Sequence, residues 1–309
     1  MKNLFTQLSE IFTNKIWRLD TSKMSTAKRR VVRFVKLVRI TVDTFMQNRM
    51  GFQCVALSYF VALAIVPLAA FIFAVTNGLN LSDKLDQFIV NISPANLDLT
   101  SVIREKALNI IDTAQSGAVG LVSALTFGFT IIWLMFQVER VFNNVWGLSK
   151  VPRKIYMRFS FYLLILLLTP FLLIIFGAGI AYYSDVATLI GFDLGDKMLP
   201  DVLMGIGLYV VTVFTFSAMY KFIPATKVQY KWALRSAVFS GLVFVLFQYI
   251  YLETQTFVTR MNAVYGAIAA IPLLLIWMNF NWQIIIYGAE LCYGYHHVDT
   301  YNIPEWKEE

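Results

Sequence analysis

The sequence is poor in charged residues, cysteine and histidine, and each shortage argues against a class of protein. Asp, Glu, Lys and Arg make up 15% of the 309 residues, whereas a soluble domain carries about a quarter. The two cysteines, Cys54 and Cys292, are too few for a disulfide framework, and we expect both to be reduced thiols. The two histidines, His296 and His297, are adjacent, and neighbouring side chains do not converge easily on one metal ion.

Catalytic and nucleotide-binding motifs are missing as well. The sequence contains no phosphate-binding Walker loop, no H-E-x-x-H zinc motif, no G-x-S-x-G nucleophile motif and no cysteine pair at metal-ligand spacing. These absences argue against an ATP-driven pump and a metal-dependent hydrolase. We therefore expect a protein that is not an enzyme and that has neither a metal site nor a cofactor.

Apolar residues dominate the composition. They make up 58% of the chain, its mean hydropathy is +0.63, and six long stretches lack Asp, Glu, Lys and Arg altogether. A helix needs about 20 mostly apolar residues to cross the hydrocarbon layer of a membrane. The pattern predicts an all-α membrane protein, a six-transmembrane-helix bundle over 50–292 with a polar tail over 293–309. The spans are expected at about 53–76, 114–138, 159–183, 202–220, 236–252 and 263–289.

The basic residues between these stretches predict the orientation of the chain. If both termini lie in the cytoplasm, the cytoplasmic segments hold 21 of the 26 Lys and Arg residues. Because cytoplasmic loops of membrane proteins are enriched in Lys and Arg, this is the favoured topology. The acidic tail is weak evidence against it, since acidic residues contribute little to orientation.

The first 49 residues predict amphipathic helices that lie on the cytoplasmic face of the membrane. Valines at spacings of three and four alternate with basic residues, which indicates a basic helix at an anionic leaflet. We expect anionic lipid headgroups as its partner rather than nucleic acid. A second apolar run precedes it over 4–16. The basic residues expected at the membrane surface are Arg29, Arg30, Arg33, Lys36 and Arg39.

Three further features concern the outer loop and the packing of the spans. Two helical periods over 81–111, separated by Pro94, predict an extracytoplasmic helical hairpin, which either packs over the spans or covers a cavity as a lid. Small residues four apart at Gly120, Ala124 and Gly128 favour close approach of another helix, from the same chain or from a second copy in a homo-oligomer. Prolines inside the spans predict helix kinks at Pro67, Pro170 and Pro272.

The last span carries the strongest functional signal. At about 100° per residue, four polar side chains fall on one helix face, and such groups are costly in hydrocarbon. This face predicts a cavity open to the cytoplasm; the equally weighted alternative is that the amides bond to neighbouring helices and the carboxyl group lies at the interface. The candidates for lining the cavity are Asn279, Gln283, Tyr287 and Glu290. Glu139 and Arg140 are charges at its inner mouth, or simple interfacial anchors.

The last predicted span contains the run from Tyr265 to Trp277, followed by Trp282 and the Gly-Ala-Glu-Leu sequence at 288–291. This pattern resembles the last-span motif of the YihY/virulence factor BrkB family. Further matches are Ala-Leu-Ser-Tyr at 56–59 with Val-Pro-Leu at 66–68, Asn-Asn-Val-Trp at 143–146, and Ile-Pro at 223–224. The resemblance implies a six-span protein of the bacterial inner membrane with an envelope role.

Three functions follow in order of preference. The first is secondary or passive transport of a lipid, a small amphiphile or another small solute. The second is an envelope scaffold that transports nothing. The third is the ribonuclease activity that members of the family have carried as a label, and it is least favoured because the chain lacks a constellation able to hold catalytic metals.

Overall fold

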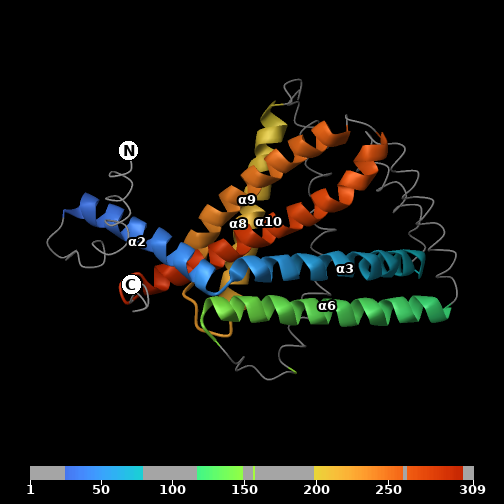
Figure 1. The fold of residues 1–309 in the computed structure, drawn as a ribbon, viewed down its shortest axis with the longest axis horizontal. Coiled ribbons are helices and arrows are strands. Elements are labelled where there is room, and N and C mark those ends of the chain that lie inside the picture. Colours follow the sequence, from blue (N-terminus) through green and yellow to red (C-terminus); the bar gives the residue numbers. More distant parts are fainter. Residues whose placement is uncertain (1–24, 79–116, 149–155, 157–197, 260–262, 302–309) are drawn as a thin grey trace, which may run out of the picture. The chain divides into compact units, whose positions relative to one another are not determined.

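The computed structural model describes residues 25–78, 117–148, 156, 198–259 and 263–301. Within these ranges the chain is helical and contains no strand, which confirms the all-α fold class (Figure 1). The helices are α2 (Thr26–Gln47), α3 (Met50–Gly78), α6 (Gly117–Val145), α8 (Met198–Phe222), α9 (Tyr230–Thr259) and α10 (Ala263–His297). The predicted third span, the outer hairpin, the run over 4–16 and Pro170 lie outside the described residues.

The chain forms two compact units that divide α3 and α6. One unit comprises Met1–Val55, Glu139–Lys154 and Leu167–Glu309, and the other comprises Ala56–Val138 and Ile155–Leu166. In the described part of the first unit, α10 packs against α2, α8 and α9, and α8 packs against α9. The candidate site residues therefore all belong to the first unit.

Five of the six predicted spans fall on described helices. Among the residues that the structure describes, one segment, Tyr230–Tyr251 of α9, is both long and apolar enough to cross a membrane by itself, and Met50–Ala64 and Ile206–Phe222 are shorter apolar helical segments. Pro67 and Pro272 lie inside α3 and α10 respectively. The number of spans stays a prediction.

Helix α2 has three sectors around its axis, as its sequence pattern requires. The sector against α10 is buried and includes Leu37, Ile40 and Phe45. A second apolar sector is exposed, and a third is polar. The exposed apolar residues are Val31, Phe34, Val38, Val42 and Met46.

The ends of α2 and α6 have distinct backbone geometry. Arg49 joins α2 to α3 with a φ of 50°, in the left-handed region that commonly follows the end of a helix. Gly147 terminates α6 in the same region, with a φ of 65°, and a glycine adopts it without steric cost. The N–H groups of Trp146 and Leu148 both donate to the carbonyl of Asn143, which closes this helix end.

Candidate functional site

Glu290 is the most deeply buried of the four candidate cavity residues. Its side chain is 0% exposed, one carboxylate oxygen (Oε2) has no hydrogen-bond partner among the described residues, and the other is 3.5 Å from the amide nitrogen of Asn48. Glu290 lies beyond the predicted last span, which ends at 289. Burial raises the pKa of Glu290 to about 7, and the nearby polar groups of Thr44 and Asn48 lower it by a smaller amount.

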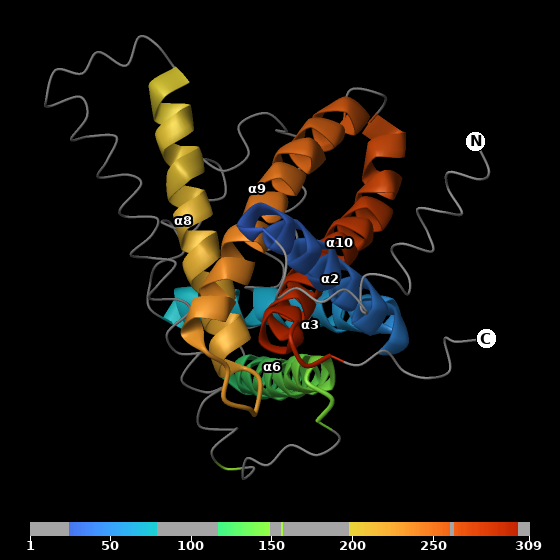
Figure 2. The same cartoon turned by 90° about the vertical axis from the view of Figure 1, so that its left-hand side faces the viewer.

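The wall that buries Glu290 is supplied largely by α2. Helix α2 packs antiparallel to the second half of α10, so residues later in α2 contact residues earlier in α10 (Figures 1 and 2). We call this contact the α2–α10 seam. It joins Arg33 to Asp299, Leu37 to Gly294 and Phe45 to Tyr287, and Asn48, the residue after the end of α2, contacts Glu290.

Aromatic stacking fixes Tyr287 within the seam. The rings of Phe45 and Tyr287 are parallel to within 6° and their centroids are 3.8 Å apart. Tyr287 is nevertheless 36% exposed, so one side of its ring faces α2 while the rest is accessible. Tyr287 can therefore contact a ligand without leaving its stacked position.

Asn279 and Gln283 form a pair one turn apart on α10. The amide nitrogen of Gln283 donates to the side-chain oxygen of Asn279 at 2.6 Å, and both residues are half-buried. The amide nitrogen of Asn279 is buried without a hydrogen-bond partner among the described residues. The pair thus satisfies part of its hydrogen-bonding capacity within the helix and retains one free donor.

The two predicted inner-mouth charges have different environments. Glu139 is 1% exposed, whereas its neighbour Arg140 is exposed. Asn143, one turn further along α6, is also 1% exposed, and its side-chain oxygen accepts a hydrogen bond of 2.7 Å from the backbone N–H of Ala225. This bond fastens the connection between α8 and α9 to the end of α6.

Aromatic contacts hold the C-terminal end of α10 against the C-terminal end of α6. Trp146 contacts the rings of Tyr293, His296 and His297 edge to face. A ring nitrogen of His296 accepts a hydrogen bond of 3.2 Å from the backbone N–H of Gln229, so this histidine is neutral in the observed arrangement. Burial lowers the pKa of His296, with smaller contributions from His297, Lys231 and Lys221.

Gly288 permits the close approach of three helices. A Cβ atom added at this position would lie 2.7 Å from the hydroxyl oxygen of Ser240 on α9, and closer still to the hydroxyl oxygen of Tyr220 on α8. Those two hydroxyl groups hydrogen-bond to each other at 2.9 Å, and Ser240 also donates to the carbonyl of Ser236. Only a residue without a side chain fits beside this pair.

A second polar network joins α9 to α10. The indole N–H of Trp277 donates to Gln248 at 2.8 Å, and Gln248 donates to the side-chain oxygen of Asn281 at 2.6 Å. Asn281 in turn donates to the carbonyl of Trp277. The sequence reasoning missed this network, although Gln248 within an otherwise apolar span was the signal that could have indicated it.

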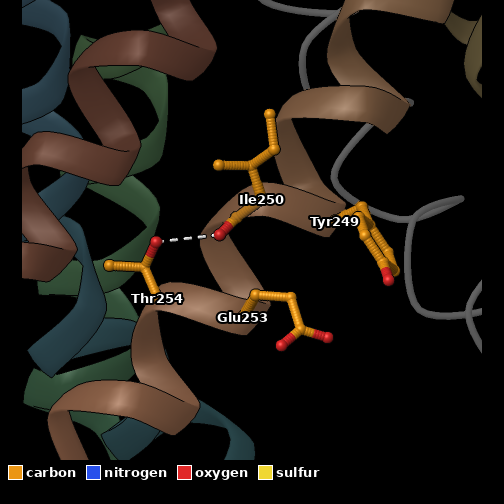
Figure 3. A pocket seen from close by; sticks show the side chains of 4 residues that line it. All are labelled: Tyr249, Ile250, Glu253 and Thr254. Atoms are coloured by element: carbon orange, nitrogen blue, oxygen red, sulfur yellow. Dashed lines mark hydrogen bonds between the residues drawn. The ribbon is translucent and has the colours of Figure 1, made fainter.

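The described residues also contain a hollow of about 380 Å³ on the exposed side of α9 (Figure 3). Its lining residues, Tyr249, Ile250, Glu253 and Thr254, belong to one helix and are all exposed. Thr254 donates to the carbonyl of Ile250, so its hydroxyl group is already engaged. This hollow is separate from the four candidate cavity residues.

Within the described ranges, no cluster of three or more His, Cys, Asp or Glu residues could hold a metal ion.

The five predicted surface cations of α2 differ in their surroundings, and Lys36 is half-buried. Arg33 pairs with Asp299 at 2.8 Å, and Arg39 pairs with Asp43 at the same distance. Arg29 and Arg30 are exposed. Cys54 and Cys292 are both buried.

Comparison with known protein families shows to which family this chain belongs. The family model described as "Virulence factor BrkB" matches residues 41–309. This chain belongs to the virulence factor BrkB family. Its relatives include UPF0761 membrane proteins from Aggregatibacter aphrophilus (28% identical, covering 80% of this chain and 87% of the relative) and Mannheimia succiniciproducens (27% identical, 80% and 85%). A third, from Vibrio vulnificus, is 26% identical over 83% of this chain and 81% of its own. No solved structure matches the chain.

Membership in the BrkB family confirms the resemblance and identifies a bacterial membrane protein. The structure shows what several residues of the BrkB-like motifs do. Gly288 and Glu290 lie in the contacts of α10 with α8, α9 and α2, and Trp277 belongs to the network with Gln248. Asn143 binds the turn that follows Pro224, so two motifs that lie far apart in the sequence are in contact.

Proposed function

We propose that this BrkB-family protein spans the bacterial inner membrane six times, with both termini in the cytoplasm, and moves a lipid, a small amphiphile or another small solute by secondary or passive transport. The distribution of Lys and Arg supports the orientation. Five described helices contain, or nearly contain, a predicted span each, which supports the topology.

The observation that carries the transport proposal is the burial of Glu290. An ionised carboxyl group without a partner costs several kcal/mol to bury, and Glu290 lies at the inner end of the last predicted span, where a pathway for ions or substrates would open to the cytoplasm. A purely structural position would be filled at lower cost by an apolar residue. The exposed edge of Tyr287 and the half-buried amide of Asn279 lie on the same helix face, and we infer that this face supplies polar contacts for a substrate headgroup.

Transport can be tested in proteoliposomes of phosphatidylethanolamine and phosphatidylglycerol that contain a fluorescent phospholipid. We expect Glu290→Gln and Asn279→Ala each to lower the initial rate of lipid movement at least about tenfold, the effect of losing about 1.4 kcal/mol of interaction at the rate-limiting step. Glu253→Gln, an exposed glutamate on α9, serves as the matched control and should leave the rate unchanged. Unchanged movement in folded Glu290→Gln protein would contradict the proposal for lipids, and a panel of small solutes then tests the remaining substrate classes.

The scaffold alternative draws on a different observation. Tyr287 is stacked on Phe45, and Gln283 is bonded to Asn279, so part of the polar face is satisfied within the protein. In a scaffold, these contacts exist to hold α10 against its neighbours, and a second copy of the chain would be the partner. Transport-deficient variants that retain full envelope integrity in cells, together with a crosslinked dimer, would favour this function.

Anionic lipid is the partner that we propose for α2. Its exposed apolar sector suits acyl chains, and the adjoining basic residues suit phosphate groups. Because Arg33 and Arg39 already have acidic partners within the chain, Lys28, Arg29 and Arg30 are the principal lipid contacts.

Thermal unfolding in neutral detergent checks the lipid contact. Added phosphatidylglycerol should raise the Tm of the wild type, and the triple change of Lys28, Arg29 and Arg30 to Gln should remove at least about half of that rise, since each basic residue near an anionic surface contributes about 1 kcal/mol. The matched control changes Lys227, Lys231 and Arg235 to Gln and removes the same charge from the connection between α8 and α9 and from the start of α9. Equal losses in both triple variants would show that only net charge matters.

A further inference from the structure

The α2–α10 seam encloses an acid that lacks the partners expected of a structural carboxylate. Glu290 is 0% exposed, Oε2 has no hydrogen-bond partner among the described residues, and the 3.5 Å contact from Asn48 to the other oxygen is long. The two ion pairs made by arginines of α2, Arg33 with Asp299 and Arg39 with Asp43, join other residues. A carboxyl group in such surroundings gains free energy when it accepts a proton.

The groups around Glu290 favour a proton over a metal ion. From α2 it meets the hydroxyl group of Thr44 and the amide of Asn48, and Tyr293 and Tyr301 interact with it electrostatically. Asp43 interacts with the same Tyr301. On the opposite side of α10, Gly288 contacts the neutral hydroxyl groups of Tyr220 and Ser240. A bound cation requires a shell of several oxygen ligands, and the described residues offer no cluster of three acidic or metal-ligating side chains here.

We propose that Glu290 is a proton-binding site: its carboxylate takes up a proton from water to form the neutral acid, and release of that proton leaves a buried charge in the α2–α10 seam. The role of this proton as the coupling ion rests on the transport function proposed above. Proton binding itself does not, because it can be measured without any substrate.

Deprotonation also has a direct effect on the seam. The raised pKa of Glu290 means that, between its ordinary value of 4.5 and about 7, the folded protein holds a proton that the unfolded chain has released. The contribution of Glu290 to stability is therefore greatest below the unfolded pKa and is lost as the pH rises through the folded pKa. Acid stabilises the seam, and alkali weakens the contact of α2 with α10.

Infrared difference spectroscopy on the purified full-length protein in detergent tests proton binding directly. The spectrum of the wild type minus that of Glu290→Gln should contain a protonated carboxyl band that titrates with a midpoint at about pH 7, and Glu253→Gln should not remove this band. Asn48→Leu keeps the acid but removes a donor to its charged form, so the midpoint should move upward. A band that titrates near the ordinary glutamate value, or a midpoint that Asn48→Leu leaves unmoved, would overturn the proposal.

Thermal unfolding gives a second readout. Between about pH 8 and about pH 5, the Tm of the wild type should rise by about 3 °C or more relative to that of Glu290→Gln. If Glu290→Gln fails to fold, the upward shift in Asn48→Leu still decides the question. Confirmed proton binding combined with absent lipid or solute movement would retain this site and refute the transport function alone.

Discussion

Replacing Gly288 by alanine is expected to reduce the yield of folded protein sharply and to lower the free energy of unfolding by about 3 kcal/mol or more. The added methyl group would overlap the hydroxyl groups of Tyr220 and Ser240, and overpacking a close-packed site costs about 1–3 kcal/mol, occasionally more. Neither hydroxyl group can withdraw cheaply, because Tyr220 is 1% exposed and the two groups bond to each other. Size-exclusion chromatography and thermal unfolding in detergent measure the effect.

Two further glycines serve as controls for this prediction. Gly207 lies on an exposed part of α8 with no atom within 4 Å of an added Cβ, so Gly207→Ala should be neutral or stabilise the helix by up to about 1 kcal/mol. An added Cβ at Gly294 would lie 2.9 Å from the terminal methyl group of Leu37, which can rotate away, so an intermediate loss is expected. An equal change in the free energy of unfolding of all three alanine variants would contradict the explanation that steric overlap destabilises Gly288→Ala.

A double substitution tests which atom causes the loss of stability expected for Gly288→Ala. Tyr220→Phe removes the hydroxyl oxygen that would be closest to the added methyl group, and it leaves the ring carbon at 2.7 Å. Combining Tyr220→Phe with Gly288→Ala should therefore restore part of the lost stability. The recovery should be incomplete because Ser240 still lies at 2.7 Å.

Sequence reasoning was most successful where a single helix determines the answer. The charge-free stretches and the spacing of Val31, Val35, Val38 and Val42 reflect the period of one helix, and the helical class and α2 both follow from them. The family resemblance was also confirmed, because it rests on local motifs. The placement of α2 on a membrane surface stays a prediction.

Contacts between helices could not be predicted in the same way. For the polar face of α10 the sequence left two options open, a cavity or hydrogen bonds to neighbouring helices with the carboxyl group at the interface. The structure pairs Gln283 with Asn279 along the helix and places Tyr287 and Glu290 against α2 and its C-terminal end. A helical wheel shows which side chains share a face, but it does not contain the partner helix that covers them. Antiparallel packing of α2 on α10 depends on tertiary contacts that no local pattern encodes.

The second large effect is expected at Gln248. Gln248→Leu conserves approximate volume but leaves the indole N–H of Trp277 without its acceptor and the side-chain oxygen of Asn281 without its donor. Hydrogen bonds between membrane helices average about 0.6 kcal/mol, and an unsatisfied polar group that is fully buried costs about 1–3 kcal/mol. Because Gln248, Trp277 and Asn281 are half-buried, a total loss of at most about 2 kcal/mol is expected. A double-mutant cycle with Asn281→Leu should show coupling between the two residues.

Gln283→Leu is the matched comparison, because it makes the same chemical change on the other side of α10. Gln283 bonds to Asn279 within one helix, so its loss separates no helices and should reduce stability less than Gln248→Leu does. The proposed transport function predicts the reverse order for lipid movement, since Gln283 lies on the polar face and Gln248 does not. If the less stable variant were also the one with slower transport, both effects would reflect helix packing alone, and the polar face of α10 would have no separate role.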